Sequence, residues 1–448
     1  MRPRPKATGL LVAQNETTQA NDNLPFDGSF EASEDTLDAD VGGDTAGAAN
    51  PHRSAPHEGQ YHLGVALHHL GQHERAVELL RACVAESGGR IDWANKLGNI
   101  LTAQGRFAQA AEVFGQAVEK APKNAQLWTN LGAARDRSGD FPGAEKAYQT
   151  AISLQPHSQE AYQLLSALYA GRNMELEAVR AYCAGYIVAP RETTTPYLLG
   201  KAYYVLERFD EAAEVYRLWK EAEPNNPVPA HLFAACSRGD VPDRCSDDYV
   251  NVTFDEYAGH FESKLSHLDY CGPALLVRLM GLHFEAEATL NVLDAGCGTG
   301  LCAPILRPYA KILTGVDLSG SMLEIAEQRG LYESLHKAEI GSFLRNGERY
   351  DLIACMDTLI YFGAIEDIFG KFAASLQPGG WLIFTSEICA ENNRTFQLNP
   401  SGRYSHSVSY LRKAMEENGF DCLVLEHETL RTELQRPVLG VIALARRV

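Results

Sequence analysis

The sequence predicts a multidomain protein in which an all-α solenoid of helical repeats is followed by an α/β domain with a mostly parallel sheet. The first observation is a sequence repeat with a period of 34 that runs from residue 57 to residue 226. The second is an apolar run that ends in Asp294 and continues into three glycines in a G-x-G-x-G pattern. The third is another apolar run, which ends in Asp317. Such runs are typical of parallel strands that are covered on both faces.

Length and composition place the chain among ordinary globular proteins. Its 448 residues are enough for two or three domains, and 45% of them are hydrophobic. The formal net charge of −18 disfavours generic binding to nucleic acid, which depends on basic surfaces. No apolar run is long enough to span a membrane, and the one near the N-terminus is too short for a signal peptide. We therefore expect neither nucleic acid nor a membrane as a partner.

The ten cysteines are scattered and form no C-x-x-C pair, so no metal site is predicted. We interpret them as reduced thiols in a cytoplasmic protein. Residues 1–56 are predicted to be a disordered acidic tail, because they hold few large apolar residues and because Asp and Glu outnumber Lys and Arg nine to four.

The period of 34 predicts five two-helix units over residues 57–237, the last followed by a capping helix. A leucine and a small residue open the pattern of each unit, and a bulky residue follows 16 positions later. The small residues are Gly64, Gly98, Gly132, Ser166 and Gly200, and the bulky residues are Leu80, Phe114, Tyr148, Tyr182 and Tyr216. Period and pattern match the tetratricopeptide repeat. We expect the small residues to let the two helices of a unit approach, and the bulky ones to fill the gap to the next unit.

Two units depart from the pattern at the turn between their helices. Gly71, Gly105 and Gly139 occupy this turn in the first three units, but Asn173 and Glu207 replace them in the last two. Asn tolerates the left-handed conformation and Glu does so less well, so the turn geometry there stays open.

The solenoid has two interpretations. It is a surface for dimerisation or docking, or its concave face is a groove that binds a protein or peptide. Polar residues expected on the inner helices are candidates for a carboxylate clasp, or else an ordinary solvated face. They are Asn95, Lys96, Asn99, Asn130, Arg135 and Lys201.

Residues 238–250 are predicted to be a linker, and residues 251–448 the α/β domain. Glycine lets the backbone after Asp294 turn tightly and approach a ligand, at Gly296, Gly298 and Gly300. An NAD-dependent enzyme is disfavoured, because the dinucleotide fingerprint is G-x-G-x-x-G and the third glycine comes one residue early here. The motif resembles the cofactor loop of class I S-adenosylmethionine-dependent methyltransferases. The resemblance implies a Rossmann-like domain with a seven-stranded sheet, and S-adenosylmethionine in contact with Asp294 and Cys297.

A helical stripe before the first strand extends the resemblance. Its sequence, from Phe254 to Leu265, has apolar residues at i, i+3, i+7 and i+11. With the repeats in front of it, the stretch is similar to the bacterial predicted methyltransferases that contain tetratricopeptide repeats, over nearly all of residues 57–448. This similarity implies that the helix covers the cofactor and that Tyr257 faces it.

Further cofactor residues are expected where strands end. A carboxylate at Asp317 can accept both ribose hydroxyls, unless it only caps the next helix. Glu339 is expected near the adenine amino group, or else is a surface residue. The other side chains expected beside the cofactor are Leu318, Met322, Ile340, Met356 and Asp357.

The acceptor side is expected after the fourth and fifth strands. Tyr361 is the candidate there after the fourth strand, and Glu387 at the exit of the fifth. The polar segment 401–407 is expected to form a wall, with His406 as the candidate general base or else as a core histidine. Residues 421–426 and 438–445 are predicted as the last strands, with Arg431 and Glu433 in the connection between them.

Two functions follow from this pattern. The first is an enzyme that transfers a methyl group from S-adenosylmethionine to a protein or small-molecule acceptor, with the solenoid recruiting substrate or partner. The second is an interaction protein whose cofactor domain is catalytically silent. The intact glycines and Asp317 favour the first.

Overall fold

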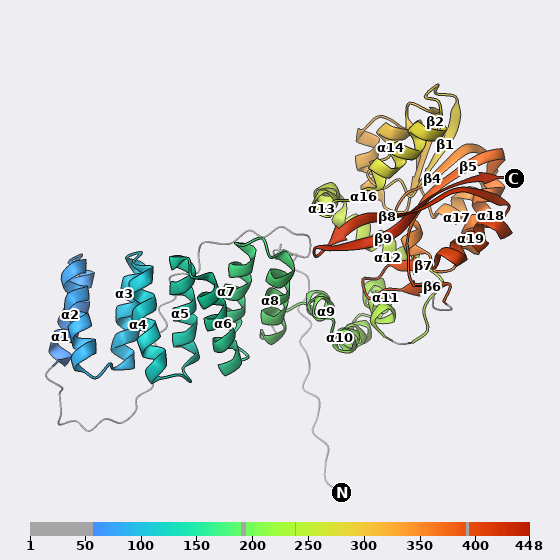
Figure 1. The fold of residues 1–448 in the computed structure, drawn as a ribbon. Coiled ribbons are helices and arrows are strands. Elements are labelled where there is room, and N and C mark those ends of the chain that lie inside the picture. Colours follow the sequence, from blue (N-terminus) through green and yellow to red (C-terminus); the bar gives the residue numbers. More distant parts are fainter. Residues whose placement is uncertain (1–56, 190–193, 238, 391–393) are drawn as a thin grey trace, which may run out of the picture.

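A computed structural model describes residues 57–189, 194–237, 239–390 and 394–448. The predicted tail, residues 1–56, lies outside the described residues. The N-terminal half is a row of antiparallel helix pairs (Figure 1). Its helices are α1 (Glu58–His69), α2 (His73–Glu86), α3 (Ile91–Ala103), α4 (Phe107–Lys120), α5 (Ala125–Ser138), α6 (Phe141–Leu154), α7 (Gln159–Ala170), α8 (Glu175–Val188), α9 (Pro196–Val205), α10 (Phe209–Ala222) and α11 (Pro227–Cys236).

The small residues of the repeat allow close packing inside each unit. A Cβ added to Gly98 would lie 2.4 Å from the ring of Phe114, and one added to Gly132 would lie 2.6 Å from Tyr148. The bulky residue therefore first fills the space that the glycine of its own unit leaves. The prediction that it fills the gap to the next unit needs this correction, although Tyr148 also joins a core cluster with Leu165 of the following unit.

The turns of the last two units keep the geometry of the first three. Asn173 has a φ of 58° and Glu207 a φ of 60°, compared with 71° for Gly105. Both residues take the left-handed conformation, which is unfavourable for a side chain with a Cβ. Asn tolerates this conformation, whereas Glu207 also forms ion pairs, to Arg180 and Arg436.

The C-terminal half is an α/β domain, so the predicted fold class is confirmed. Its strands are β1 (Leu290–Ala295), β2 (Ala310–Asp317), β3 (Ser334–Lys337), β4 (Tyr350–Cys355), β5 (Leu376–Glu387), β6 (Phe396–Leu398), β7 (Tyr404–His406), β8 (Phe420–Glu433) and β9 (Arg436–Arg447). Seven of them form one sheet in the order β3-β2-β1-β4-β5-β9-β8. The first five strands of that order are parallel, β9 runs antiparallel to β5, and β8 runs antiparallel to β9 at the edge of the sheet.

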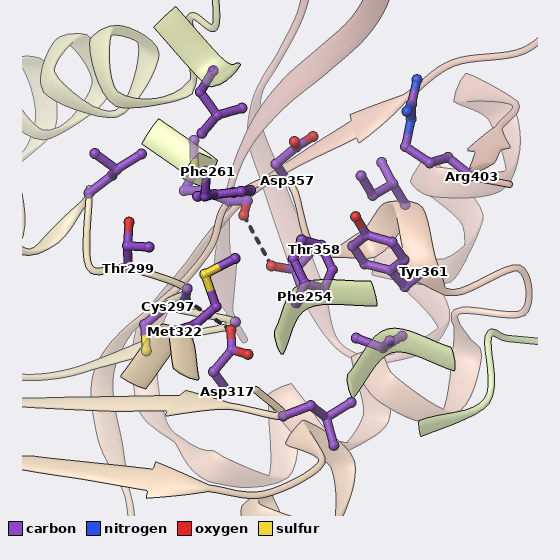
Figure 2. Close-up of a pocket in the computed structure, with 18 of the residues that line it drawn as sticks. Phe254, Phe261, Cys297, Thr299, Asp317, Met322, Asp357, Thr358, Tyr361 and Arg403 are labelled. Carbon is purple, nitrogen blue, oxygen red and sulfur yellow. Dashed lines mark hydrogen bonds between the residues drawn. The ribbon is translucent and has the colours of Figure 1, made fainter. Parts of the chain in front are cut away.

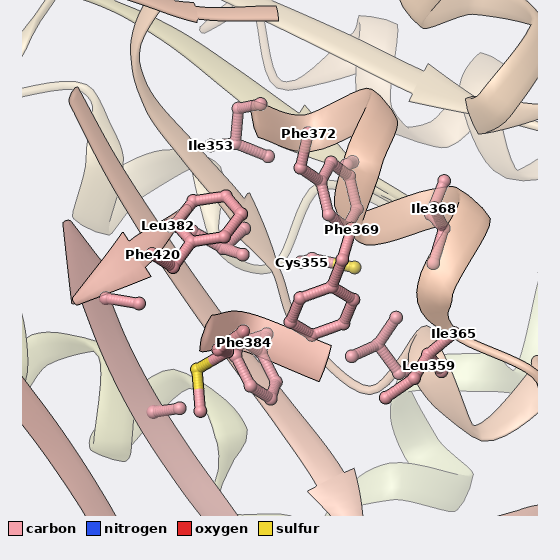
Figure 3. Packing of buried hydrophobic residues seen from close by; sticks show 14 of the residues in the cluster. Ile353, Cys355, Leu359, Ile365, Ile368, Phe369, Phe372, Leu382, Phe384 and Phe420 are labelled. Carbon is pink, nitrogen blue, oxygen red and sulfur yellow. The ribbon is translucent and has the colours of Figure 1, made fainter. Parts of the chain in front are cut away.

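Helices cover both faces of this sheet (Figure 1). The helices of this half are α12 (Asp247–Tyr257), α13 (Phe261–His267), α14 (Gly272–His283), α15 (Ala303–Leu306), α16 (Gly320–Gln328), α17 (Ile340–Phe343), α18 (Glu366–Ser375) and α19 (Val408–Glu417). One core cluster joins the strands to α18 and α19, and a second joins them to α14 and α15. Figure 3 shows the first, where the rings of Phe369 and Phe384 meet edge to face with centroids 5.3 Å apart. These two cores fix the strand ends that carry the site.

Two local predictions need correction. The apolar stripe that starts at Phe254 is not one helix, because α12 ends at Tyr257 and a 3₁₀ turn over Ala258–His260 separates it from α13. Gly259 lies in that turn, and glycine weakens a helix interior. The last strands are also longer than predicted, and β8 runs to Glu433, so Arg431 and Glu433 lie in a strand. Among the described residues, no helix is both long and apolar enough to cross a membrane.

Candidate functional site

A pocket of about 250 Å³ opens at the carboxyl ends of β1, β2 and β4. Parallel α/β sheets bind ligands at this edge, where the strand order reverses. The glycine loop and the end of β2 line one side of the pocket, and the residues after β4 line the other. In Figure 2, Cys297, Asp317 and Met322 gather on the first side, and Tyr361 and Arg403 lie on the second.

The glycine loop is shaped by left-handed backbone at Gly296, Gly298 and Gly300, with φ values of 77°, 52° and 79°. A Cβ on Gly296 would lie 2.3 Å from Thr358 Oγ1, whereas one on Gly298 would meet nothing within 4 Å. Gly298 therefore leaves the backbone open toward the pocket. The structure brings Gly296, Cys297 and Gly298 to the pocket wall, together with Thr299 and Leu301. Gly300 is not part of that wall and packs beside Tyr332.

Asp317 is held rigidly at the end of β2. Its Oδ2 accepts a hydrogen bond from the Gly298 backbone N–H at 2.9 Å, and its Oδ1 accepts one from the Ser319 N–H at 2.9 Å. The N-cap of α16 is Ser319, whose hydroxyl accepts from the Met322 N–H at 3.1 Å. Asp317 therefore ties the glycine loop to the start of α16, and its remaining lone pairs are available at the pocket wall.

Asp294 lies deeper, at the end of β1, and is 2% exposed. The hydroxyl of Tyr332 donates to its Oδ2 at 2.7 Å. Burial raises the pKa of this carboxyl group to about 7, although the Tyr332 hydrogen bond opposes the shift. The group therefore titrates close to neutral pH, on the pocket wall beside the glycine loop.

Most of the remaining cofactor candidates lie at the pocket wall. Leu318, Met322, Glu339, Ile340 and Met356 all line the pocket. Glu339 also caps the short helix α17, since its carboxylate accepts hydrogen bonds from the backbone N–H groups of Gly341 and Ser342. An ion pair of 3.6 Å joins it to Arg244, a pocket residue that sequence reasoning missed.

Five charged residues form what we call the charged cluster at the other end of the pocket. They are Asp357, Glu387, Arg403, Arg431 and Glu433. All but Glu387 line the pocket. The cluster joins the exits of β4 and β5 to the segment before β7 and to the end of β8.

Arg431 is the centre of the charged cluster. Its Nη1 donates to Asp357 Oδ1 at 3.0 Å, its Nε donates to Glu433 Oε1 at 2.7 Å, and its Nη2 is paired with Glu387. Arg403 donates to Glu387 from Nε at 2.8 Å and to Glu433 from Nη2 at 2.6 Å. Burial alone would raise the pKa of Glu433, but the two guanidinium groups lower it to about 2. Glu433 therefore stays ionised at neutral pH, and charge-assisted hydrogen bonds to both arginines hold it in place.

Besides Gly300 and Glu387, two further predicted residues do not reach the pocket. The Tyr257 hydroxyl lies 2.6 Å from that of Tyr197 in α9, so Tyr257 faces the solenoid rather than the cofactor side. The break after α12 explains this, because the predicted face assumed one continuous helix. Phe254 and Phe261 line the pocket from the same region.

His406 is the second residue that does not reach the pocket. It is fully buried in β7, outside the pocket wall. Its Nε2 lies 2.8 Å from the Phe362 carbonyl, which can only accept, so Nε2 carries the proton and Nδ1 accepts from Ser386 at 2.8 Å. Burial lowers the pKa of His406 to about 4. It is a neutral core histidine, and the predicted role as general base does not fit this position. Tyr361, the other candidate, lines the pocket.

Fold and site together define a repeat protein that carries a methyltransferase domain. Residues 265–425 match the family model described as a methyltransferase domain. Residues 57–82, 95–161 and 163–227 match models described as tetratricopeptide repeats. The predicted combination of the two is confirmed.

Curated relatives match only part of the chain. A ubiquinone biosynthesis O-methyltransferase of Coxiella burnetii is 33% identical over 111 residues, which is 23% of this chain and 47% of the relative. A ubiquinone biosynthesis O-methyltransferase of Burkholderia multivorans is 30% identical over 118 residues, which is 25% of this chain and 50% of the relative. The chain thus spans about half the length of these relatives. A solved S-adenosylmethionine-dependent methyltransferase of Mesorhizobium loti is 21% identical, with a TM-score of 0.30, and the match covers 38% of this chain and 95% of that one.

Proposed function

We propose that this chain transfers a methyl group from S-adenosylmethionine to a protein or small-molecule acceptor. The observation that carries the proposal is the pocket at the ends of β1, β2 and β4, where Asp317 fixes an open glycine loop. The match to a methyltransferase domain supports the reaction class. The cofactor would lie between the glycine loop and Met322, and the acceptor near Tyr361 and the charged cluster.

The pocket residues fit this cofactor chemically. Asp317 presents lone pairs to a ribose, and the open backbone at Gly298 accommodates close approach. Thr299 Oγ1 is buried and has no hydrogen-bond partner among the described residues, as expected of a group that awaits a ligand. Asp294, once ionised, offers a negative charge to a cationic ligand.

The residues of this chain would act by binding, orienting and excluding water. When bound, S-adenosylmethionine supplies a methyl group that its sulfonium centre already activates. Phe254, Phe261 and Leu265 would keep water from the reacting atoms, and the rigid charged cluster would orient the acceptor. A general base is needed only if the acceptor atom loses a proton as it attacks.

Two observations bear on the acceptor. The similarity to ubiquinone biosynthesis O-methyltransferases favours a small molecule, whereas the solenoid favours a protein or peptide bound on its concave face. The proposed partners include neither nucleic acid nor a membrane, in line with the net charge of −18, and the proposed compartment is the cytoplasm.

Transfer of a labelled methyl group into a size-fractionated cell lysate tests the proposal. We expect label in one fraction with the wild-type protein, and at least about 10-fold less with Asp317→Ala at subsaturating S-adenosylmethionine. A macromolecular fraction would identify a protein acceptor, and a low-mass fraction a small molecule. Calorimetric binding of S-adenosylmethionine without labelling in any fraction would favour the silent interaction protein, and absence of binding would contradict both.

A further inference from the structure

The turn between β8 and β9 has an unusual conformation for its residues. Glu433 pairs with Arg436 across the hairpin, so the loop consists of Leu434 and Gln435 only. Their φ values are 48° and 58°. Two-residue hairpins of this kind favour Asn-Gly or Asp-Gly, because a positive φ is unfavourable for other residues. The tip therefore needs contacts from outside the hairpin to keep this shape.

Those contacts come from the fourth and fifth repeats of the solenoid. Figure 1 shows the hairpin of β8 and β9 extending from the sheet toward α8. Leu434 packs against an apolar cluster that α8 and α9 provide. The buried members of that cluster are Val179, Cys183, Ala202 and Val205.

Two polar contacts accompany the packing of Leu434 against this apolar cluster. Gln435 Nε2 donates to the backbone carbonyl of Asn173 at 3.3 Å, and Arg436 Nη1 lies 3.3 Å from Glu207 Oε1. Asn173 and Glu207 are the two residues that replace glycine at the turns of the repeats. Their departure from the repeat pattern thus coincides with the place where the hairpin docks.

The segment that carries Arg403 of the charged cluster also contacts the solenoid. The Gly402 carbonyl lies 2.8 Å from Nε2 of His231 in α11, and Gly402 precedes Arg403. Tyr204 of α9 packs against the same apolar cluster as Leu434, and burial and the charge of Glu433 raise its pKa. The last repeat and the capping helix therefore touch both segments that carry the arginines.

We propose that Leu434 and Arg436 are positioning residues, which fix Arg431 and Glu433 at the acceptor end of the pocket by anchoring the β8–β9 hairpin to the fourth and fifth repeats. Arg431 and Glu433 lie only three and one positions before Leu434, so a change at the tip moves both side chains. The solenoid is thus part of the scaffold of the acceptor site, in addition to any partner it binds.

The test compares substitutions in the full chain by nuclear magnetic resonance of [¹⁵N]arginine. The Nε–H signals of Arg431 and Arg403 are identified by their loss in Arg431→Lys and Arg403→Lys. Leu434→Asn introduces a residue that tolerates positive φ but removes the apolar contact, whereas Leu434→Met keeps the contact. Leu439→Asn makes the same change at a position of β9 that is 55% exposed.

We expect Leu434→Asn to shift or broaden the Arg431 signal, and Leu434→Met and Leu439→Asn to leave it in place. Arg436→Gln, at an exposed residue, removes the ion pair to Glu207 and should shift the same signal less. If Leu434→Asn does not fold, the Arg431 signal of the Arg436→Gln variant tests the proposal instead. An unchanged Arg431 signal in the folded tip variants would overturn the proposal.

The role in methyl transfer rests on the proposed function, but the positioning does not, because the signals are read without an acceptor. Once a labelled fraction is found, Leu434→Asn should lower the initial rate at saturating S-adenosylmethionine at least about five-fold, while the Kd for S-adenosylmethionine stays within about two-fold. Equal rates for Leu434→Asn and Leu439→Asn would refute the catalytic consequence. Absence of transfer by the wild-type protein would refute the proposed function instead.

Discussion

Arg431 donates from Nη1 to both carboxylate oxygens of Asp357, at 3.0 and 3.3 Å, across 74 residues of sequence. Arg431 is 3% exposed and also holds two glutamates. Replacing it with methionine leaves three partly buried carboxylates around one remaining arginine. We expect Arg431→Met to lower the free energy of unfolding by about 3–5 kcal/mol in chemical denaturation.

Arg278 offers a matched control, because it too lies between two acids of β8, Glu426 and Glu428, but on the surface. Arg278→Met should change the free energy of unfolding by less than about 1 kcal/mol. Similar losses for the two variants would contradict the view that the charged cluster acts as a buried unit.

Local patterns in the sequence were enough to predict the fold and to find residues of the pocket wall around the glycine loop. The 34-residue period depends on packing within a unit, as Gly98 and Phe114 show, and the strand-end residue Asp317 acts on neighbours in its own loop. Such features are encoded over short distances, so spacing reveals them.

The charged cluster could not be predicted in the same way. Arg431 and Glu433 read as loop residues, because a two-residue turn made of Leu434 and Gln435 carries no glycine or asparagine signal. The prediction that Tyr257 faces the cofactor was wrong for a related reason. It assumed one continuous helix, whereas a turn at Gly259 breaks the helix. Both Leu434 and Tyr257 contact the solenoid, and such long-range contacts cannot be read from local spacing.

Asp317 should be required for cofactor binding. Asp317→Ala removes the acceptor of the Gly298 and Ser319 N–H groups as well as the proposed ribose contact. We expect calorimetry to give an affinity for S-adenosylmethionine at least about 10-fold weaker, which corresponds to roughly 1.4 kcal/mol. Glu324→Ala, an exposed acid of α16, serves as control. Wild-type affinity in a folded Asp317→Ala protein would refute the site assignment.

Asp294 should make stability depend on pH. Its pKa of about 7 in the folded chain lies above the ordinary value of 3.8, so the folded state binds the proton more tightly. Its contribution is complete below about pH 4 and is lost as the pH rises through 7, by at most about 1.4 kcal/mol per pH unit. Wild type should therefore lose stability relative to Asp294→Asn as the pH rises from about 5 to about 7 in urea titrations.

Tyr332→Phe sharpens this test, because it removes the hydrogen bond that opposes the pKa shift of Asp294. The loss of stability should then extend to higher pH. A difference between wild type and Asp294→Asn that does not vary with pH would show that the carboxyl group titrates normally.

Phe254 and Tyr257 lie three residues apart but should affect the pocket differently. Phe254 lines the pocket, with its ring 5.5 Å from that of Tyr361, whereas Tyr257 contacts Tyr197 of the solenoid. We expect Phe254→Ala to weaken calorimetric binding of S-adenosylmethionine about 10-fold, and Tyr257→Phe to leave it within about two-fold. The reverse order would restore Tyr257 as the residue that covers the cofactor.

Alanine substitutions at two glycines of neighbouring helices should change the free energy of unfolding in opposite directions. A Cβ on Gly98 in α3 would lie 2.4 Å from the Phe114 ring, whereas one on Gly115 in α4 would meet nothing within 4 Å. Gly98→Ala forces Phe114 to move and should lower the free energy of unfolding by about 1–3 kcal/mol. Gly115→Ala only removes the entropic cost of glycine in a helix and should raise it by about 0.5–1 kcal/mol. Denaturation followed by circular dichroism measures both, and destabilisation by Gly115→Ala would mean that α4 is covered on its outer face.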